Sequence, residues 1–394
     1  MRGILKFLLS LLVLLVFAWV GLWWYAQGRI ASGFAAWAET QATNGLKISY
    51  SSLQTGTSPL QALVTIHNLV ITLPPEADGH SGTVTLPTLG LRINAANPTV
   101  FYTDFPNKIA VAIDNDIDAV INTGSIVVSE TLDPNALFNK TKFPFRSGDL
   151  AASNIDILAS QGSLLVMHID SLTDHSDLNL NADAGSPVLV GTTTINGMAL
   201  SPILTRIGSI PFGGKITHLG IGFSLSGPVP PDLNDALNKL RAMQTDPVAE
   251  QKLLMPLVHE WAVGGGNGSI NLAITIGPSA AAADAALKFD ANLQPTGTAN
   301  LTALQVDAFT SAITNAYPST QDSMAAAQAL LSPYLTTSPT DGQSLALHAI
   351  FGNGTVSLNG QKVADMPPVD WNALENPSTP PAVPTTGPTT GTAQ

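Results

Sequence analysis

One polar segment near the middle of the chain gathers side chains that could do chemistry. Two histidines and two aspartates lie within His168-Ile-Asp170-Ser-Leu-Thr-Asp174-His175. Imidazole and carboxylate groups at this spacing could ligate a metal ion or form an acid–base pair. Alternate residues of a strand share a face, so His168 and Asp170 would lie side by side on one. We favour the simpler interpretation, in which a strand ends here and runs into a polar turn.

Three alternating aspartates, Asp114, Asp116 and Asp118, form a second candidate. A strand would place all three carboxylates on one face, where they could hold a cation weakly. A solvated edge or loop explains the same residues, and we favour it. The glycine-rich run 264–269 follows a predicted helix and precedes a predicted strand, the reverse of the order in a phosphate-binding loop. We therefore predict no catalytic, cofactor-binding or metal-binding residues.

The composition limits the possible partners. The 394 residues include 16 basic and 28 acidic side chains, which gives a net charge of −12. Phosphate binding needs clustered Lys and Arg, so we exclude a nucleic-acid partner. Cysteine is absent, which excludes disulfides and a thiolate nucleophile. Only 11% of the residues are charged, and the neutral polar surface that this implies suits an extended β structure.

The elements that would position these groups begin with an apolar stretch from Phe7 to Ala26. A helix of about 20 residues spans about 30 Å, the thickness of the hydrocarbon core of a bilayer. Arg2 and Lys6 precede the stretch, so the positive-inside tendency keeps residues 1–6 in the cytoplasm. A cleaved signal peptide is the alternative, but its apolar region is normally shorter. We predict an uncleaved, single-pass anchor in a bacterial inner membrane, with the bulk of the chain in the periplasm.

Aromatic rings favour the headgroup layer, and we predict four membrane-interface anchors at the outer end of the stretch: Trp19, Trp23, Trp24 and Tyr25. The segment 27–45 continues as a juxtamembrane helix with an apolar stripe of Ile30, Phe34 and Trp37. The stripe could pack on the following domain or lie on the membrane surface, and we favour packing. Asn44-Gly45 should end the helix, because glycine readily adopts the left-handed conformation found there.

Alternating apolar and polar residues dominate a β-rich half, 46–229. Its longest run, Ala62–Leu73, is rich in β-branched residues and ends at two prolines. Turn residues recur about every 10 residues, which leaves no room for crossover helices and predicts an antiparallel meander. The expected strands are 46–50, 62–73, 83–86, 89–94, 109–113, 118–121, 125–128, 154–158, 163–169, 177–182, 192–198 and 216–226.

The remainder divides into three parts. A helical insert at 230–263 has start signals at Asp232 and at Asp246-Pro247. A second β half with two helices follows at 264–372, and residues 373–394, mostly Pro, Thr and Gly, should be disordered.

We therefore predict a mainly β fold with helical inserts, in which a single N-terminal transmembrane helix precedes a long curved antiparallel sheet. Alternation alone leaves open one sheet, a barrel or a sandwich. The expected elements of the second half are strands at 269–276, 285–293 and from 297, helices at 306–317 and 321–331, and a hairpin of 345–351 and 355–358.

Several stretches of this layout together resemble a known family. They are the basic start with its anchor and Trp-bearing helix up to Asn44-Gly45, the segment 56–60 before the long strand, 268–276 followed by 288–297, and 353–358 leading to 366–369. The family is a bacterial envelope family known as domain of unknown function 2125. The pattern of strands and acidic turns is also similar to AsmA-like envelope proteins, whose long curved sheets are associated with lipid handling. The first family has no established activity that the resemblance could imply.

Three hypotheses for function follow from these observations. The first is a non-enzymatic, membrane-anchored periplasmic protein that binds or transfers lipid along an apolar concave face. The second is a structural or adaptor module that binds other envelope proteins through the insert 230–263. The third is a hydrolase with a site near His168 and His175. The anchor, the many strands and the low charge favour the first.

Overall fold

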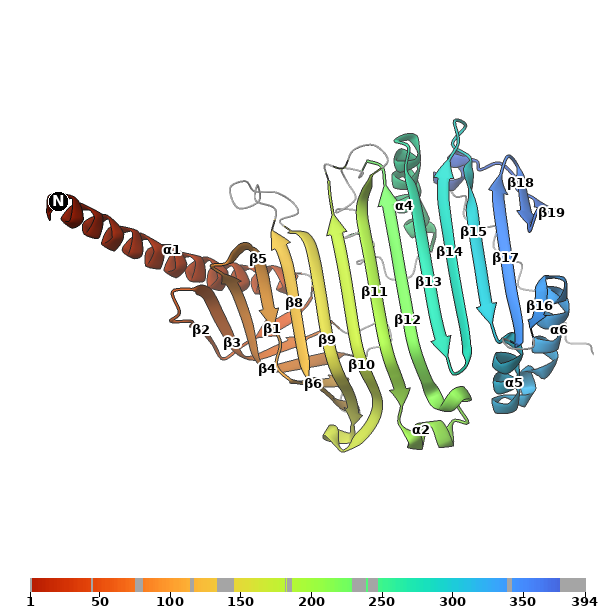
Figure 1. Cartoon of the computed structure of the whole chain (residues 1–394), viewed down its shortest axis with the longest axis horizontal. Helices are drawn as coiled ribbons and strands as arrows, with labels where there is room; N and C mark the ends of the chain where they lie inside the picture. The colour runs from red at the N-terminus through yellow and green to blue at the C-terminus, as the bar shows by residue number, and fades with distance from the viewer. Residues whose placement is uncertain are drawn as a thin grey trace, which may run out of the picture.

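A long helix leads into one curved, open sheet that forms most of the protein (Figure 1). Within the described residues the sheet contains 19 strands, and every pairing is antiparallel. The prediction of a mainly β fold with one large antiparallel sheet is confirmed. The computed structural model describes residues 2–43, 45–74, 81–113, 117–132, 145–180, 182, 186–228, 239, 247–338 and 342–375, with the backbone alone for 2–17, 117, 161 and 247.

The first element is helix α1, Arg2–Thr43. Of the predicted stripe, Phe34 is buried and Ile30 packs against the same core at the start of the sheet, so packing is confirmed for these two residues, whereas Trp37 is 45% exposed. Trp23 and Gln27 of the helix are also buried. The N–H of Gly45 donates to Ala42 O and that of Leu46 donates to Gln41 O, which closes the helix in a Schellman motif. Gly45 has φ +84, as its predicted capping role requires.

The strands follow one another across the sheet with few exceptions. Strand β3 pairs with both β1 and β2, and β9 to β15 form an uninterrupted up-and-down meander that continues into β17. The strands are β1 (Lys47–Ser49), β2 (Ser52–Thr55), β3 (Gln61–Thr72), β4 (Gly82–Asn94), β5 (Asn97–Asp104), β6 (Lys108–Ile113), β7 (Ile117–Asn122), β8 (Ser125–Leu132), β9 (Phe145–Ala159), β10 (Leu164–Leu178), β11 (Pro187–Leu200), β12 (Lys215–Ser226), β13 (Asn267–Ile276), β14 (Ser279–Phe289), β15 (Pro295–Leu304), β16 (Leu335–Ser338), β17 (Gly342–Gly352), β18 (Thr355–Leu358) and β19 (Gln361–Asp365).

The sheet forks between β4 and β9. One half of β4 pairs with β5, which pairs with β8, and the other half pairs with β6, which pairs with β7. Both β7 and β8 then pair with β9, so two short pairs of strands fill the place of two long ones. Strand β5 was not anticipated from the sequence. The predicted strands 83–86 and 89–94 are one strand, β4.

A crease crosses the sheet where several strands leave ordinary β geometry. Asn68, Asn154 and Gly197 have φ values of +50, +48 and +64 within β3, β9 and β11. Left-handed residues within a strand bend it and shift its face alternation by one residue. In β9, for example, Ala152 and Ile155 are both buried on the same face, on either side of Asn154. The crease therefore curves the sheet while one face stays apolar along its whole width.

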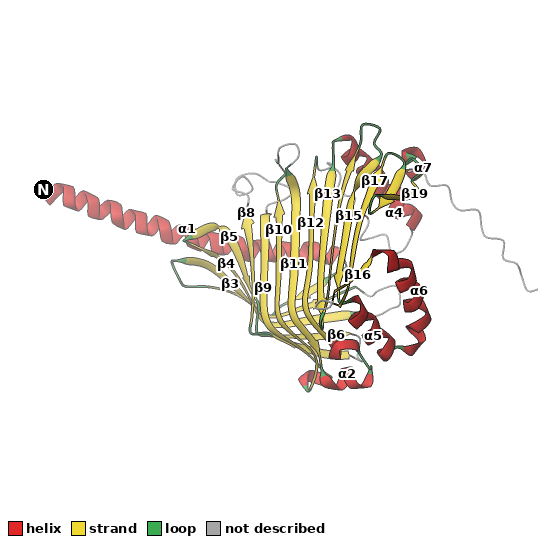
Figure 2. Cartoon of the chain, turned by 45° about the vertical axis from the view of Figure 1, so that its right-hand side comes forward, coloured by secondary structure: helices red, strands yellow, loops and turns green. Residues whose placement is uncertain are grey.

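Helices gather on the concave side of the sheet (Figure 2). Besides α1 they are α2 (Pro202–Ile207), α4 (Pro247–Val263), α5 (Val306–Ala316), α6 (Gln321–Leu331) and α7 (Trp371–Glu375). The predicted second helix of the insert begins at Pro247, as expected, and α5 and α6 match their predictions. Helix α2 was not anticipated, although Ser201 caps it through a bond from Leu204 N–H. The predicted helix that starts at Asp232, and residues 376–394 of the predicted disordered tail, lie outside the described residues.

The predicted anchor is only partly described. Among the described residues no helix is both long and apolar enough to cross a membrane. The side chains of residues 7–17, which make up most of the predicted span, lie outside that part of the chain.

Candidate functional site

The concave face of strands β11 to β15 and β17 is apolar over its whole width. Residues directly opposite one another in the register form rows across the strands, and their side chains share a face. The three central rows contain one hydroxyl and no charge. They are Gly191, Phe223, Ile270, Ala285, Ala299 and Ala349, then Thr193, Ile221, Leu272, Ala283, Leu301 and Leu347, then Ile195, Leu219, Ile274, Ala281, Ala303 and Leu345.

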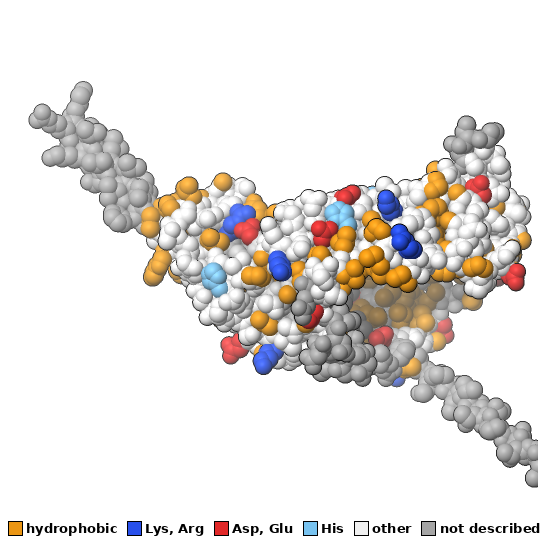
Figure 3. Space-filling view, turned by 90° about the horizontal axis from the view of Figure 1, so that it is seen from below, with side chains coloured by type: hydrophobic (Ala, Val, Ile, Leu, Met, Phe, Trp, Pro, Cys, Tyr) orange, Lys and Arg blue, Asp and Glu red, His pale blue; other side chains and the backbone are white. Residues whose placement is uncertain are grey.

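Five large side chains of this face remain accessible to solvent, and we call them the apolar strip. They are Ile221, Phe223, Leu225, Ile270 and Leu272, each between 39% and 45% exposed. They belong to two neighbouring strands, β12 and β13, so they form one contiguous surface. Figure 3 shows the hollow of the concave face with apolar side chains lining it. Contiguous exposed apolar surface of this kind commonly marks a binding site.

The opposite, convex face is polar. One row there consists of Asn271, Asp284, Asn300 and His348. Asn300 Nδ2 donates to Asp284 Oδ2 at 2.8 Å, and His348 Nδ1 lies 2.6 Å from Asn300 Oδ1. Around this row the sheet separates a hydrated surface from an apolar one.

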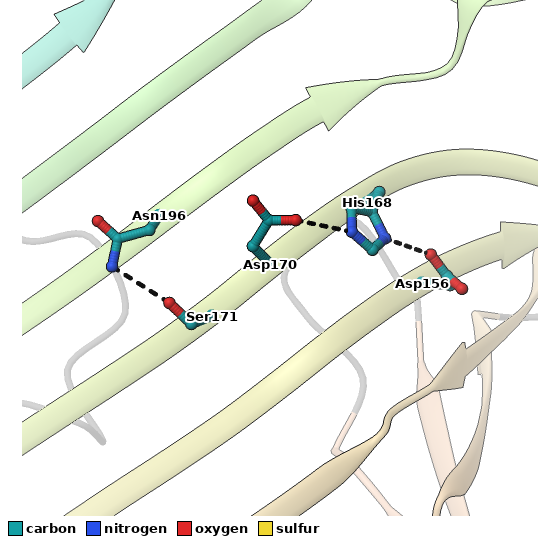
Figure 4. A network of polar contacts seen from close by, with 5 residues as sticks. All are labelled: Asp156, His168, Asp170, Ser171 and Asn196. Atoms are coloured by element: carbon teal, nitrogen blue, oxygen red, sulfur yellow. Dashed lines mark hydrogen bonds and ion pairs between the residues drawn. The ribbon is translucent and has the colours of Figure 1, made fainter.

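His168, Asp170 and His175 lie on the convex face of β10 and Asp174 lies on its concave face, so the predicted strand end and polar turn were wrong. His168 Nδ1 lies 2.6 Å from Asp156 Oδ1, and its Nε2 lies 3.0 Å from Asp170 Oδ1 (Figure 4). The hydrogen bond with Asp156 is the main cause that raises the pKa of His168, and desolvation opposes it. Cross-strand pairing with β9 supplies Asp156, which is why a polar segment continues as a strand.

The four residues of the predicted cluster do not converge on one site. His175 pairs with Asp149 at 2.7 Å, whereas the Asp174 carboxylate accepts a hydrogen bond from Thr193 Oγ1. Both ring nitrogens of His168 already face carboxylates, which leaves the imidazole in a bridging position. Within the described residues no group of three or more His, Asp or Glu side chains could hold a metal ion. Asp118 lies in β7, and Asp114 and Asp116 lie outside the described residues.

A cavity of about 710 Å³ opens at the end of the concave face next to the loop between β13 and β14. Strand residues such as Met198, Ile276 and Ala281 form its floor, and Phe309 and Ile313 of α5 cover it. The 3-10 turn Pro211–Gly214 closes one side. We call this cavity the α5 pocket. Sequence reasoning missed it, because it combines α5 with strands spread along the chain from Met198 to Leu345.

Two carboxyl groups of the described residues lie on the apolar face: Asp174 of β10, directly opposite Thr193, and Glu130, at the rim opposite the α5 pocket. Glu130 of β8 follows Ile126 and Val128 at two-residue spacing and lines a cavity of about 290 Å³ together with Phe145 and Arg146. Burial raises the pKa of Glu130. The partly buried carboxyl group of Glu130 makes this end of the concave face more polar than the α5 pocket, whose lining contains no charged residue.

The four predicted interface aromatics divide into two pairs. Trp23 is buried, and Trp19 Nε1 donates to Pro59 O at 2.9 Å while its ring meets Trp23 edge-on at 5.6 Å. Trp24 and Tyr25 are 77% and 64% exposed on the other side of α1. Two of the four therefore contact the protein, and two are free to meet a headgroup layer.

Comparison with known proteins identifies a family. The model of an uncharacterized protein family conserved in bacteria, DUF2125, matches residues 23–367. The chain belongs to the DUF2125 family. No curated protein and no solved structure matches it. The matched segment runs from Trp23 of α1 to just beyond β19, so the helix–sheet contact and the concave face both lie within the family domain.

Proposed function

We propose that this protein is a non-enzymatic lipid-binding protein of the bacterial cell envelope, which holds acyl chains on its concave face. Its α1 helix would anchor it in the inner membrane, with residues 1–6 in the cytoplasm and the sheet in the periplasm. The observation that carries the proposal is the apolar strip. Exposed apolar area costs about 25 cal/mol per Å² relative to burial, so an accessible surface of this kind favours an apolar ligand.

The charge distribution supports a lipid over a soluble metabolite. Small polar ligands are normally fixed by several convergent polar groups. The three central rows of β11 to β15 and β17 offer only the Thr193 hydroxyl, and that hydroxyl is already bonded to Asp174, the neighbouring residue of β10 on the same face. The convex face holds the polar rows instead. An acyl chain needs no such groups and gains by burial alone.

Helix α1 supports a location at a membrane. Its packed stripe holds the sheet directly beside the helix, so a span that continues from α1 would keep the concave face near the bilayer surface. The adaptor hypothesis has less support. Helix α4 of the insert uses part of its surface to hold α7, through His259 Nδ1 and Glu375 Oε1 at 2.5 Å and through Gln251 Nε2 and Leu374 O.

A matched pair of substitutions tests the proposal. Leu272→Asp places a charge in the apolar strip, whereas Asn271→Asp places the same charge one residue away on the convex face. The full chain in detergent would be mixed with vesicles of phosphatidylethanolamine and phosphatidylglycerol that carry a trace of fluorescent phosphatidylethanolamine. We expect Leu272→Asp to lower uptake about ten-fold, since desolvating a carboxylate opposes chain binding. Equal uptake by both variants, or none by the wild type, would contradict the proposal.

A further inference from the structure

The α5 pocket differs from the rest of the concave face because it is covered. Gln305, the N-cap residue of α5, has a φ of +53, which turns the chain away from β15 so that the helix lies across the strand ends. Phe309 of α5 stacks on Phe212 at a centroid distance of 6.3 Å. Phe212 in turn lies against Gly277, where an added Cβ would lie 2.3 Å from Phe212 Cδ1. Helix α5, the 3-10 turn 211–214 and the loop between β13 and β14 therefore pack together and cover one end of the concave face.

The lining of the pocket indicates the chemistry of its occupant. It contains no charged residue, and only Ser279 and Tyr317 carry polar side-chain atoms. Ser279 Oγ already donates to Gln305 O at 3.0 Å. The strands of the floor use their backbone N–H and C=O groups in the ladder, so a peptide entering the pocket would leave its own backbone unpaired. A hydrocarbon chain has no such groups to satisfy.

The pocket and the apolar strip are continuous. Ile270, Leu272, Ile274 and Ile276 follow at two-residue spacing along one face of β13, and the last two line the pocket. Six residues of strand extend about 20 Å at about 3.4 Å per residue. Half of a hydrocarbon core, the depth that one acyl chain fills, is about 15 Å. The strip and the pocket together are therefore long enough to hold a single chain.

We infer that the α5 pocket receives the methyl end of one acyl chain, whose remaining length lies along the apolar strip toward the rim of the sheet. The inference rests on the proposed function and adds a direction to it. The covered, uncharged end of the face takes the chain terminus. The other end of the strip, at Leu225 and Ile270, is left for the polar part of the lipid.

Two probes determine the direction. One is a phosphatidylcholine with a diazirine at the methyl end of an acyl chain, and the other has the diazirine next to the ester. Each is offered in phosphatidylcholine vesicles to the full chain, and labelled peptides are mapped by mass spectrometry after photolysis. We expect the methyl-end probe to label 276–281 and 301–313, and the ester-end probe to label 268–272. Labelling of the same peptides by both probes would overturn the inference while leaving the proposed function in place.

Neighbouring alanines supply the matched variants. Ala281→Leu fills the pocket, whereas Ala282→Leu adds the same side chain on the opposite, exposed face of β14. We expect Ala281→Leu to lower methyl-end labelling of 301–313 about ten-fold and Ala282→Leu to leave it unchanged. Leu304→Gln, at a lining residue that is 51% exposed, provides a second variant if Ala281→Leu fails to fold.

The remaining outcomes also decide between the two proposals. Equal labelling in Ala281→Leu and Ala282→Leu would overturn the pocket assignment alone. A wild-type dimer that Ala281→Leu dissociates would identify a second copy of this chain as the occupant and overturn it too. Absence of labelling by either probe would overturn the proposed function, and the inference with it.

Discussion

The carboxylate of Asp170 occupies the space that a side chain at position 197 would need: a Cβ added to Gly197 would lie 1.8 Å from Asp170 Oδ2. The pairs that flank these residues place them directly opposite each other in β10 and β11. Asn154 lies opposite Asp170 on the other side, in β9. The crease is therefore built from residues that face one another, and Gly197 combines a left-handed backbone with a close approach.

Gly197→Ala should destabilise the sheet beyond the ordinary cost of alanine at positive φ. That cost is about 1–2 kcal/mol, and the clash with Asp170 adds to it. Gly213→Ala is the matched control, because Gly213 has the same φ of +64 and nothing within 4 Å of an added Cβ. Urea unfolding followed by circular dichroism measures both variants. Equal losses of unfolding free energy would show that Asp170 moves aside without cost.

The crease also explains which strands could be predicted from the sequence and which could not. Alternation located β3, β12, β13 and the β17–β18 hairpin, because each has a regular face. It divided β4 into two strands, since the alternation shifts near Pro87, which lies opposite Asn68 in the register. It also ended a strand at Ile169, one residue before the crease. A shift in alternation marks a bend of the strand as well as its end, and the sequence does not distinguish the two.

Only part of the candidate site could be predicted from the sequence. The alternation of 269–276 revealed an apolar face, but the strip depends on which strands pair with it, and pairing partners are not encoded in alternation. Ile30 and Phe34 of the predicted stripe pack on the sheet as expected, because a helix carries its own periodicity, but Trp37 is exposed. Trp19 and Trp23 lie on the same face of α1, at helical spacing. A stripe search extended back to Trp23 would have found the buried contact.

His168 should stabilise the fold more at low pH than at high pH. Its pKa is raised above the ordinary 6.5, mainly by Asp156, so its contribution is fully present below pH 6.5 and is lost as the pH rises through the folded-state pKa. The imidazole is about one-third exposed, and solvent screening keeps the effect below about 1 kcal/mol. His168→Gln should therefore lower the unfolding free energy more at pH 5.5 than at pH 8.5.

A double-mutant cycle with Asp156→Asn separates this ion pair from loss of packing. In the Asp156→Asn background the cost of His168→Gln should lose most of its pH dependence, although Asp170 remains 3.0 Å from Nε2. Thermal unfolding over the same pH range provides a second measurement. A cost that stays equally pH-dependent without the Asp156 charge would assign the effect to other groups.

Asn359 closes the exposed edge of β17 with its side chain. Its Oδ1 accepts from His348 N–H at 2.6 Å, its Nδ2 donates to Ala346 O at 3.1 Å, and its own N–H donates to His348 O. The amide thus replaces a neighbouring strand where β16 and β18 leave a gap. Free strand edges promote pairing between chains, and natural sheets block them.

Asn359→Gly should open this edge. Glycine keeps the φ of +47 without strain, so the change removes only the side chain and its two bonds. We expect a stability loss of about 1–2 kcal/mol, together with concentration-dependent association measured by light scattering. Asn353→Gly, at another left-handed position with φ +50, is the control for the backbone change. A variant that remains monomeric at every concentration would show that β16 and β18 protect the edge by themselves.

The proposed orientation of α1 can be tested directly because the chain contains no cysteine. A single cysteine at Ser269, which is exposed on the convex face of β13, should react with a membrane-impermeant maleimide in spheroplasts. A cysteine at Gly3, within the basic start, should react only after the inner membrane is broken, since the positive-inside tendency retains that segment in the cytoplasm. Comparing Ser269→Cys with Gly3→Cys in the same preparation controls for lysis. Protection of both positions in intact spheroplasts would place the sheet in the cytoplasm, and loss of the Gly3→Cys signal from the mature protein would indicate that the segment is cleaved.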